Sequence, residues 1–358
     1  MVAVGIESDA SSAQTYRSNF PLAEVIEKDL RSVEKGEVLK VLDRKFPNRT
    51  KTVLISGPPC QPFSNANMHT HNKGGDHPCF DGIELFAKVM KEISPDAFLF
   101  ENVVTFETMD NGKSMARLLK TLNRLGFHPS LAKLHAHHYQ VPQRRRRLFV
   151  GSFREANGFE LPSNDSPWKK ENGQSKNNGD LVHVRDAISD LPRLPVGGGG
   201  REETAYPENS ERELSRYQRK ARSSATKLAN HWSTRHSDEV VDTIRLIKPG
   251  LSLVRAWRHL PRWVRNRYTN GENLQENIYR RLRWQDLSPT IVHPRRAMLL
   301  HPQANRILSV REAARLQGFP DRFRFHGGID SQYQQVANAV PPPMARFLGK
   351  LYNRRFSR

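Results

Sequence analysis

Cysteine is scarce in this sequence: only Cys60 and Cys79 occur among 358 residues. Two cysteines cannot build a disulfide framework, and the spacing of this pair matches neither a CxxC motif nor the ligands of a zinc site. The three histidines of the segment LHAHHYQ have no cysteine or carboxylate at ligand spacing. We therefore predict an intracellular protein that holds no metal.

Long apolar runs are also absent. No stretch approaches the roughly 20 apolar residues that cross a bilayer. The first residues, MVAVGIESDASSAQTY, lack the basic segment followed by an apolar one that marks a secretory signal. These absences predict a soluble protein with no membrane partner.

Acidic residues are too few to balance the basic ones. The chain has 57 Lys and Arg against 37 Asp and Glu, which gives a formal net charge of +20. A membrane surface or an acidic protein could attract such a chain. So large an excess first suggests a polyphosphate partner, however, because protein cations release the counterions that phosphates hold. The composition therefore favours nucleic acid.

Residues 1–153 alternate between strand-like and helix-like patterns. Short apolar runs of the type found in buried parallel strands occur at residues 2–7, 52–56, 97–101 and 147–153. Between them, apolar residues recur at helical spacing over 83–93 and 115–122. The pattern predicts a doubly wound α/β fold with a mostly parallel sheet, whose ligands bind at the carboxyl ends of the strands. Cys60 and Glu101 would both lie at such ends.

The chain beyond residue 153 loses this pattern. Residues 154–200 include SNDSPWKKENGQSKNNGD and a glycine run, which are linker compositions. Residues 245–283 carry ten basic residues against two glutamates, with two tryptophans and two tyrosines among them. A solvated charged face is one interpretation, but so one-sided a balance would repel itself unless an anion lies against it. We predict nucleic-acid contact through Arg255, Arg258, Arg262, Arg265 and Arg267.

Order returns in the last 70 or so residues. The segment SVREAARLQGFP predicts a helix that begins with a capping box of Ser309 and Glu312 and ends at Gly318. The segment ANAVPPPMARFLGKLY predicts a loop that leads into a closing helix.

Two polar residues stand out at strand ends. In ISGPPCQPFS, Cys60 follows a strand directly, where a thiol is usually core filler. Pro58 and Pro59, however, stiffen the backbone and remove two hydrogen-bond donors, which rarely accompanies a buried structural cysteine. Glu101 ends an apolar strand, where a carboxylate is costly unless it is solvated, paired or functional. Such a carboxyl could act as a general acid.

Four consecutive arginines precede the last strand, in QVPQRRRRLFVG. Alternate residues of an extended chain face the same way, so Arg145 and Arg147 can share one face while Arg144 and Arg146 take the other. That face could clamp a planar carbonyl group or a phosphate.

These segments together resemble the ordered motifs of the DNA cytosine-5 methyltransferases. The motifs are GPPCQPFS, FLFENV, VPQRRRR, RILSVREAARLQGFPDRF and QVANAVPPPMA, and the resemblance covers residues 2–153 and 284–350. It implies the Rossmann-like fold of class I S-adenosylmethionine-dependent methyltransferases. The implied domains are a catalytic and cofactor domain at 1–153, a smaller irregular target recognition domain with linkers at 154–283, and a segment at 284–358 that returns to the catalytic domain.

The resemblance also implies a mechanism. Cys60 would add to carbon 6 of cytosine, and Glu101 would protonate N3. Arg145 and Arg147 would hold the base carbonyl. The base would be flipped out of the duplex, because these groups cannot reach it inside the helix. The loop at 64–81 matches the mobile loop that closes over the base in this family.

The cofactor implied by the resemblance is S-adenosylmethionine. Glu7 would hold the ribose hydroxyls, and Asp29 and Leu30 the adenine. The remaining contacts would come from Pro59, Leu85, Asn338 and Val340. Two departures from the family are Ala337, where glycine is usual, and Gln140, where the family has YGVPQ.

One family motif does not appear in the sequence. A strand followed by a glycine-rich DLFxGxGG turn usually precedes the ribose-binding strand, and without it the neighbouring strands would expose unpaired edges. We therefore expect either that this strand has been lost, or that a second chain supplies it, or that the protein does not bind cofactor.

The implied reaction is methyl transfer to carbon 5 of cytosine in double-stranded DNA, as in restriction-modification systems. Two alternatives remain: a DNA-binding paralogue without cofactor, and a tRNA cytosine-5 methyltransferase, although the insert lacks the Cys-Phe-Thr signature of that branch. We expect a monomer on DNA, in a bacterial cytoplasm near the nucleoid or in a eukaryotic nucleus.

Overall fold

The computed structural model describes residues 4–58, 78–154, 158–162, 181–199, 203–206, 214–268, 274–276 and 278–357. Pro59, Cys60 and residues 64–77 of the predicted loop lie outside this set. The chain divides into two compact units. Unit 1 comprises Met1–His135, Arg146–Ser175 and Phe356–Arg358, and unit 2 comprises Ala136–Arg145 and Lys176–Arg355.

The main sheet of unit 1 has four strands in the order β3-β4-β7-β5. Their bounds are β3 Val53–Ser56, β4 Ala97–Asn102, β5 Ser130–His135 and β7 Arg146–Phe153. β3 pairs with β4 in parallel, and β7 pairs antiparallel with both β4 and β5. Three of the four strands therefore run the same way, and the sheet is mostly parallel as predicted.

The prediction that residues 147–153 form a parallel strand was wrong. His135 at the end of β5 pairs with Arg146 at the start of β7, so the chain returns beside the point where it left. A parallel return needs a crossover of a dozen or more residues, usually a helix, and the residues between these two strands are too few for one. β7 therefore runs antiparallel between β4 and β5.

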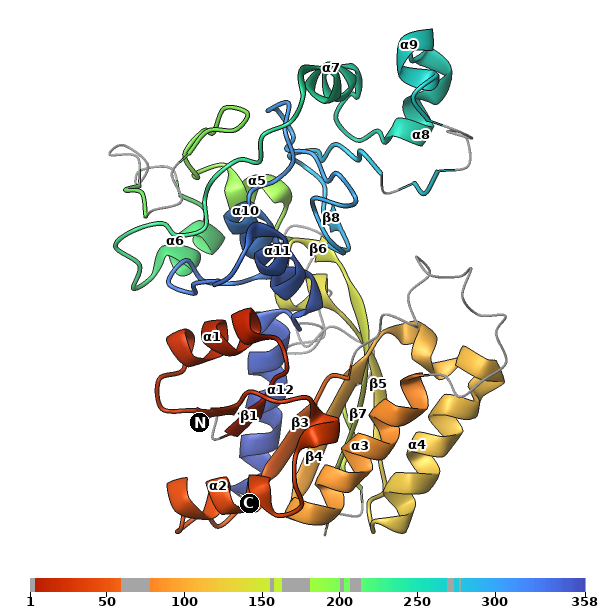
Figure 1. The fold of residues 1–358 in the computed structure, drawn as a ribbon, viewed down its shortest axis with the longest axis vertical. Coiled ribbons are helices and arrows are strands. Elements are labelled where there is room, and N and C mark those ends of the chain that lie inside the picture. Colours follow the sequence, from red (N-terminus) through yellow and green to blue (C-terminus); the bar gives the residue numbers. More distant parts are fainter. Residues whose placement is uncertain are drawn as a thin grey trace, which may run out of the picture. The chain divides into compact units, whose positions relative to one another are not determined.

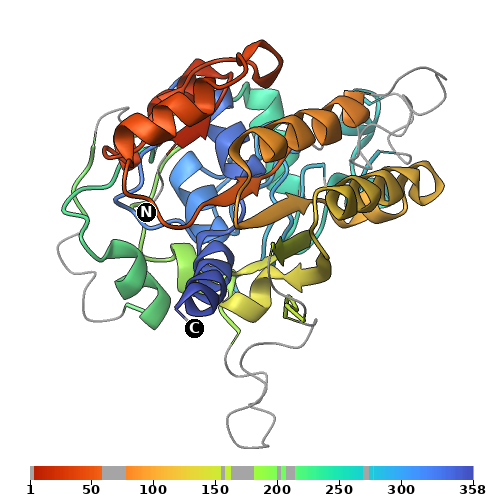
Figure 2. The same cartoon turned by 90° about the horizontal axis from the view of Figure 1, so that it is seen from below.

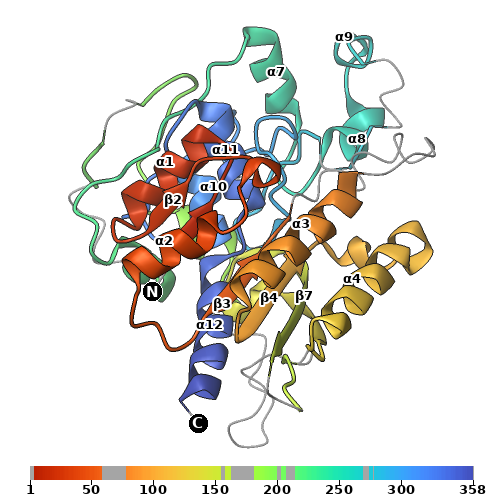
Figure 3. The same cartoon turned by 60° about the horizontal axis from the view of Figure 1, so that its bottom comes forward.

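Two predicted helices cover one face of this sheet. α3 (Pro78–Ile93) and α4 (Lys113–Arg124) lie side by side in every view (Figure 1, Figure 2 and Figure 3). Phe86 of α3 packs edge-on against Phe98 and Phe100 of β4, with ring centroids 6.0 and 5.4 Å apart. The 3-10 helices between β4 and α4 are η4 (Val104–Glu107) and η5 (Met109–Gly112). The contacts of Phe86 with β4 bury the apolar side chains of the strand that carries Glu101.

A second, two-stranded sheet completes unit 1. Parallel strands β1 (Val4–Ile6) and β2 (Glu24–Ile26) are joined by α1 (Ala10–Asn19). After β2 come η1 (Leu30–Ser32) and α2 (Glu37–Lys45), whose apolar face packs on β1 and β2. Among the described residues, β1 pairs only with β2, and β3 pairs only with β4. Within the described part of the chain, each of these two strands therefore has one edge without a strand partner.

The regular elements of unit 2 are mostly short helices joined by irregular segments. Its helices are α5 Val184–Ile188, α6 Arg216–Arg222, α7 Asp238–Leu246, α8 Leu253–Ala256, α9 Arg262–Arg265, α10 Val310–Gln317, α11 Ile329–Asn338 and nearly all of α12 Pro342–Phe356. The 3-10 helices are η6 (Ala136–Tyr139) and η8 (Trp257–His259), and β6 (Gln143–Arg144) pairs with β8 (Ser288–Pro289). In the described part of the chain no helix is long and apolar enough to span a bilayer.

α10 confirms the predicted capping box. The Ser309 side chain accepts the Glu312 amide, the Glu312 carboxylate accepts the Ser309 amide, and Gly318 ends the helix in the left-handed region at φ +93°. All eight residues of the helix are buried. The closing helix is also confirmed, as α12.

The linker prediction for residues 154–200 was wrong over residues 184–188. α5 lies there, and Val184, Ala187 and Ile188 recur at helical spacing and join the core of unit 2. The helix is too short for its periodicity to stand out in a polar sequence, and its contact with α10 decides its structure.

Candidate active site

Glu101 and Arg147 form a shielded ion pair at the end of β4. The Nε atom of Arg147 lies 2.9 Å from a carboxylate oxygen of Glu101, and only 12% and 13% of the two side chains are exposed. The antiparallel course of β7 brings its first residues beside the last residues of β4, since Asn102 pairs with Leu148. The structure therefore brings together two of the predicted catalytic residues.

The segment that leads to Cys60 begins beside this pair. A Cβ atom placed on Gly57 would lie 3.3 Å from Oε2 of Glu101, and one on Gly82 of α3 would lie 3.4 Å from Cβ of Pro58. Only a residue without a side chain fits between β3 and the carboxylate without a shift of its neighbours. Sequence reasoning missed Gly57; the signal was its position directly before the Pro-Pro-Cys motif.

The arginine run alternates as predicted. Arg144 and Arg146 are exposed, Arg147 is half-buried, and Arg145 is buried with 1% of its surface exposed. Arg145 belongs to unit 2, where its guanidinium donates to backbone carbonyls. The hydrogen bonds of Arg145 and the ion pair of Arg147 thus lie in different units.

The predicted cofactor residues of unit 1 follow parallel strands. Glu7 comes directly after β1, and its carboxylate accepts the Asp9 amide at 2.9 Å. Asp29 follows β2 and caps η1, and hydrogen bonds from the Arg31 side chain and amide lower the pKa of its carboxyl to about 2. Two carboxylates thus lie at the carboxyl ends of neighbouring strands. Leu30 packs on the small sheet, and Leu85 is half-buried in α3.

The predicted cofactor residues of unit 2 lie at the end of α11. Asn338 is the last residue of the helix and is exposed, and its side-chain oxygen accepts from Nε2 of Gln334 at 2.7 Å. Val340 follows and is half-buried.

The five predicted DNA-contacting arginines lie in or beside α8, η8 and α9. Arg255 pairs with Glu276, and Arg267 pairs with Glu239, both at 3.1 Å. Such exposed ion pairs contribute about 0–1 kcal/mol to stability. Either arginine can therefore leave its carboxylate and bind a phosphate. Arg258 and Arg262 are exposed and have no ion pair among the described residues, and Arg265 is half-buried. Beside them Trp263 is 47% exposed, a feature that sequence reasoning did not assign.

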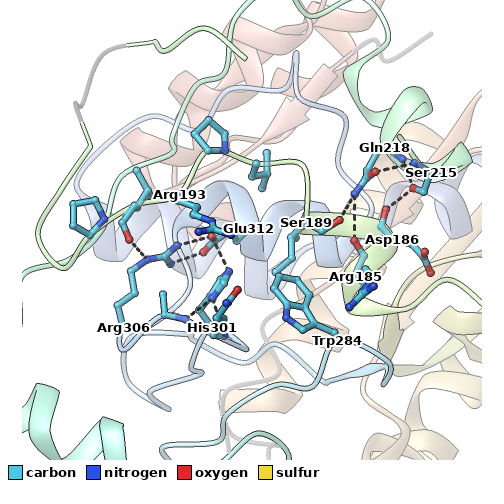
Figure 4. Close-up of a pocket in the computed structure, with 17 residues that line it drawn as sticks. Arg185, Asp186, Ser189, Arg193, Ser215, Gln218, Trp284, His301, Arg306 and Glu312 are labelled. Carbon is cyan, nitrogen blue, oxygen red and sulfur yellow. Dashed lines mark hydrogen bonds and ion pairs between the residues drawn. The ribbon is translucent and has the colours of Figure 1, made fainter. Parts of the chain in front are cut away.

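Unit 2 also contains a cavity of about 770 Å³ that no motif predicted. Figure 4 shows His301 pointing toward Glu312, whose carboxylate also receives two 2.8 Å contacts from Arg306. Nδ1 of His301 accepts the backbone amides of Gln303 and Ala304, and burial lowers the pKa of this imidazole to about 4. These residues stabilise the start of α10. Among the described residues, no group of three or more His, Cys, Asp and Glu side chains could hold a metal.

Comparison with known proteins places these motifs in one family. The family model for C-5 cytosine-specific DNA methylases matches residues 1–353. The Type II methyltransferase M.DdeI of Desulfomicrobium norvegicum is 29% identical over 363 residues, which cover 97% of this chain and 82% of the relative. DNA (cytosine-5)-methyltransferase 1 of Mus musculus is 29% identical over 96% of this chain and 26% of its own length.

The fold has solved counterparts. A crystal structure of a protein encoded within an E. coli prophage superposes with a TM-score of 0.72 at 21% identity, over 100% of this chain and 93% of that one. A second, the Entamoeba histolytica methyltransferase EhMeth, superposes with a TM-score of 0.56 at 13% identity, over 98% and 89%. Since the family model spans nearly the whole chain, this protein belongs to the C-5 cytosine-specific DNA methylases.

Proposed function

We propose that this protein methylates carbon 5 of cytosine in duplex DNA through a covalent bond between Cys60 and a flipped base. Methylation of cytosine in DNA, with S-adenosylmethionine as methyl donor, follows from membership of the family. The covalent step, the flipped base and the role of each residue are the proposal. The Glu101–Arg147 ion pair is the observation that carries it.

Carbon 5 of cytosine is a poor nucleophile, and Cys60 and Glu101 together make it more nucleophilic. The thiolate of Cys60 adds to carbon 6, and the ring gains negative charge. Glu101 delivers a proton to N3, so the ring becomes a neutral enamine whose carbon 5 is nucleophilic. After carbon 5 is methylated, its proton is lost to water, the thiolate departs and the N3 proton returns to Glu101, which restores the aromatic ring.

Arg147 supports this proton transfer. Its guanidinium holds the Glu101 carboxyl in one orientation, and the planar fork has further N–H donors for the base carbonyl. Gly57 leaves room for the Glu101 carboxyl beside the Cys60 segment. The proposed nucleophile follows β3 and the proposed acid lies at the end of β4. Ligands of α/β sheets bind at such carboxyl ends of the strands.

The donor set of unit 1 fits S-adenosylmethionine. Carboxylates accept hydrogen bonds from hydroxyl and amino groups, and Glu7 and Asp29 lie at the ends of two parallel strands, where such ligands bind. We assign Glu7 to the ribose hydroxyls, Asp29 and Leu30 to the adenine, and Pro59, Leu85, Asn338 and Val340 to the remaining contacts. When bound, the cofactor supplies an electrophilic methyl group.

The open strand edges lead to a proposed protein partner. Ile55, within the edge strand β3, is 72% exposed. β1 also has an edge without a partner among the described residues. We propose that a second chain adds a strand between β1 and β3, since edge pairing satisfies backbone groups and covers Ile55.

The direct test is methyl transfer to mixed-sequence duplex DNA. Labelled S-adenosylmethionine should yield 5-methylcytosine with the wild-type protein, and Cys60→Ala should yield none. A folded wild-type protein that leaves DNA unmethylated, with and without the added strand, would contradict the proposal. Competition between transfer RNA and duplex DNA tests the RNA alternative.

The same open edges favour one other function, a DNA-binding paralogue that does not load cofactor. A reaction that needs no cofactor tests the base site separately from the cofactor site. Reversible addition of Cys60 makes carbon 5 basic, so DNA that carries tritium at carbon 5 of cytosine should release it to water without cofactor. Tritium release together with no calorimetric binding of S-adenosylhomocysteine would indicate an intact base site and a deficient cofactor site.

A further inference from the structure

The buried guanidinium of Arg145 binds the end of α11. Its Nη1 atom donates to the Ile291 carbonyl at 3.2 Å, and Nη2 donates to the carbonyls of Ala337 and Ala339 at 2.7 and 3.1 Å. The final carbonyls of a helix have no partner within the helix and carry the negative end of its dipole. Arg145 therefore supplies both the donors and the positive charge that this helix end requires.

Two buried glutamines complete the same cluster. Nε2 of Gln317 donates to the Ala339 carbonyl at 2.6 Å, and its side-chain oxygen accepts from Nε2 of Gln143 at 2.5 Å. The side-chain oxygen of Gln143 accepts the Ile291 amide at 3.2 Å. Gln143 and Gln317 are 0% exposed. The carbonyl of Ala339 thus receives two buried donors, and the backbone on both sides of Asn338 is held.

Asn338 is the exposed residue in this held turn. Ala337 is buried and Ala339 half-buried, whereas the Asn338 side chain faces solvent. The position of Asn338 depends on the backbone of its two neighbours, whose carbonyls accept hydrogen bonds from Arg145 and Gln317.

We infer that Arg145 is a positioning residue for the cofactor, which acts by fixing Asn338. The inference rests on the proposed function, because Asn338 is assigned to the cofactor there. It replaces the prediction that Arg145 also holds the base carbonyl, because the Arg145 guanidinium donates to three backbone carbonyls instead. The two arginines of the QRRRR run thus receive separate roles. Arg147 orients Glu101 for chemistry on the base, and Arg145 orients Asn338 for cofactor binding.

The test compares Arg145→Lys with Arg147→Lys in two assays. Lysine keeps the charge but cannot serve three carbonyls with a planar fork. Loss of one or two charged hydrogen bonds corresponds to about a 10- to 100-fold change in an equilibrium constant. Arg145→Lys should therefore weaken calorimetric binding of S-adenosylhomocysteine by about 10- to 100-fold and leave cofactor-free tritium release near the wild-type rate. Arg147→Lys should slow tritium release and leave the affinity for S-adenosylhomocysteine unchanged.

Arg281→Lys is the matched control. Arg281 is 4% exposed and donates to the Ile244 and Ile247 carbonyls near the end of α7, so its substitution damages a comparable buried cluster. It should lower the melting temperature without changing the affinity for S-adenosylhomocysteine. If Arg145→Lys does not fold, Gln317→Met, which removes one donor from the Ala339 carbonyl, should show the same loss of affinity to a smaller degree.

Three outcomes would overturn the inference. If a folded Arg145→Lys variant binds S-adenosylhomocysteine with wild-type affinity, Arg145 is not a positioning residue. Additive losses in Arg145→Lys and Asn338→Ala would show that the two residues act independently, since residues in one network are not additive. A wild-type protein that does not bind S-adenosylhomocysteine would refute the proposed cofactor site as well, and this outcome is distinguishable because the unmutated chain already fails.

Discussion

At the scale of single residues, the ion pair at the end of β4 makes the sharpest prediction. Glu101→Gln keeps the shape of the side chain and an acceptor for Arg147, but it cannot deliver a proton. General acids contribute about 10²- to 10⁴-fold, and we expect kcat for methyl transfer to fall by that order.

The control is another glutamate with an arginine partner. Glu84 pairs with Arg117 on the surface of unit 1, and 62% of its side chain is exposed. Glu84→Gln should leave kcat unchanged. Equal rates for wild type and Glu101→Gln would exclude Glu101 as the acid.

Gly57 makes a second prediction at this scale. In Gly57→Ala the new Cβ would lie 3.3 Å from Oε2 of Glu101, so either the carboxyl or the Cys60 segment must move. Small displacements of reacting groups cost up to about 100-fold in rate, and we expect a fall in kcat with little change in melting temperature. Gly349→Ala, where nothing lies within 4 Å of the new Cβ, should keep full activity.

At the scale of the helices, the cavity beside α10 predicts a pH dependence of stability. Burial lowers the pKa of His301 from 6.5 to about 4, so the unfolded chain takes up the proton first. The stability that neutral His301 contributes is complete above about pH 6.5 and is lost as the pH falls toward 4. Between pH 7 and pH 5 this amounts to about 2 kcal/mol.

His301→Asn keeps an acceptor for the Gln303 and Ala304 amides but does not titrate. Urea unfolding at pH 7 and pH 5 should therefore show a smaller loss of stability in this variant than in the wild type. His259→Asn, at an exposed position, should lose as much stability as the wild type. Identical losses in all three proteins would exclude His301 as a source of the pH dependence.

Two arginines of η8 and α9 lead to a prediction for the salt dependence of DNA binding. Arg258 and Arg262 are exposed and have no ion pair among the described residues. Each phosphate contact contributes about 0.9 to the slope of log affinity against log salt, so Arg258→Ala with Arg262→Ala should reduce that slope by about 2. Alanine at Arg354 and Arg355, exposed near the end of α12, should not change the slope.

At the scale of the whole molecule, the open edges of β1 and β3 predict complementation. A peptide with an apolar strand and a glycine-rich turn should raise the melting temperature and the affinity for S-adenosylhomocysteine. Ile55→Lys should prevent both effects, because the lysine would be covered by the added strand. Leu131→Lys on the opposite edge strand, β5, where the apolar side chain is 40% exposed, should not. A peptide without effect on the wild type would count against the proposed partner.

Much of the fold was predictable because its signals are local. The apolar runs became β1, β3, β4 and β7, and the helical periodicities became α3 and α4. The capping box of α10 depends on residues three apart, so it could be identified without any tertiary contact. The short helix α5 could not, since its burial depends on contact with α10.

The sequence by itself determined the family, the motif residues, the strand and helix periods and the excess of positive charge. Each is a property of residue type and spacing along the chain. Only the tertiary structure decided the direction of β7, the pairing of Arg147 with Glu101 and the binding of Arg145 to the end of α11. The reason is physical: an arginine can be buried only where acceptors meet it, and here those acceptors come from segments far apart in the sequence.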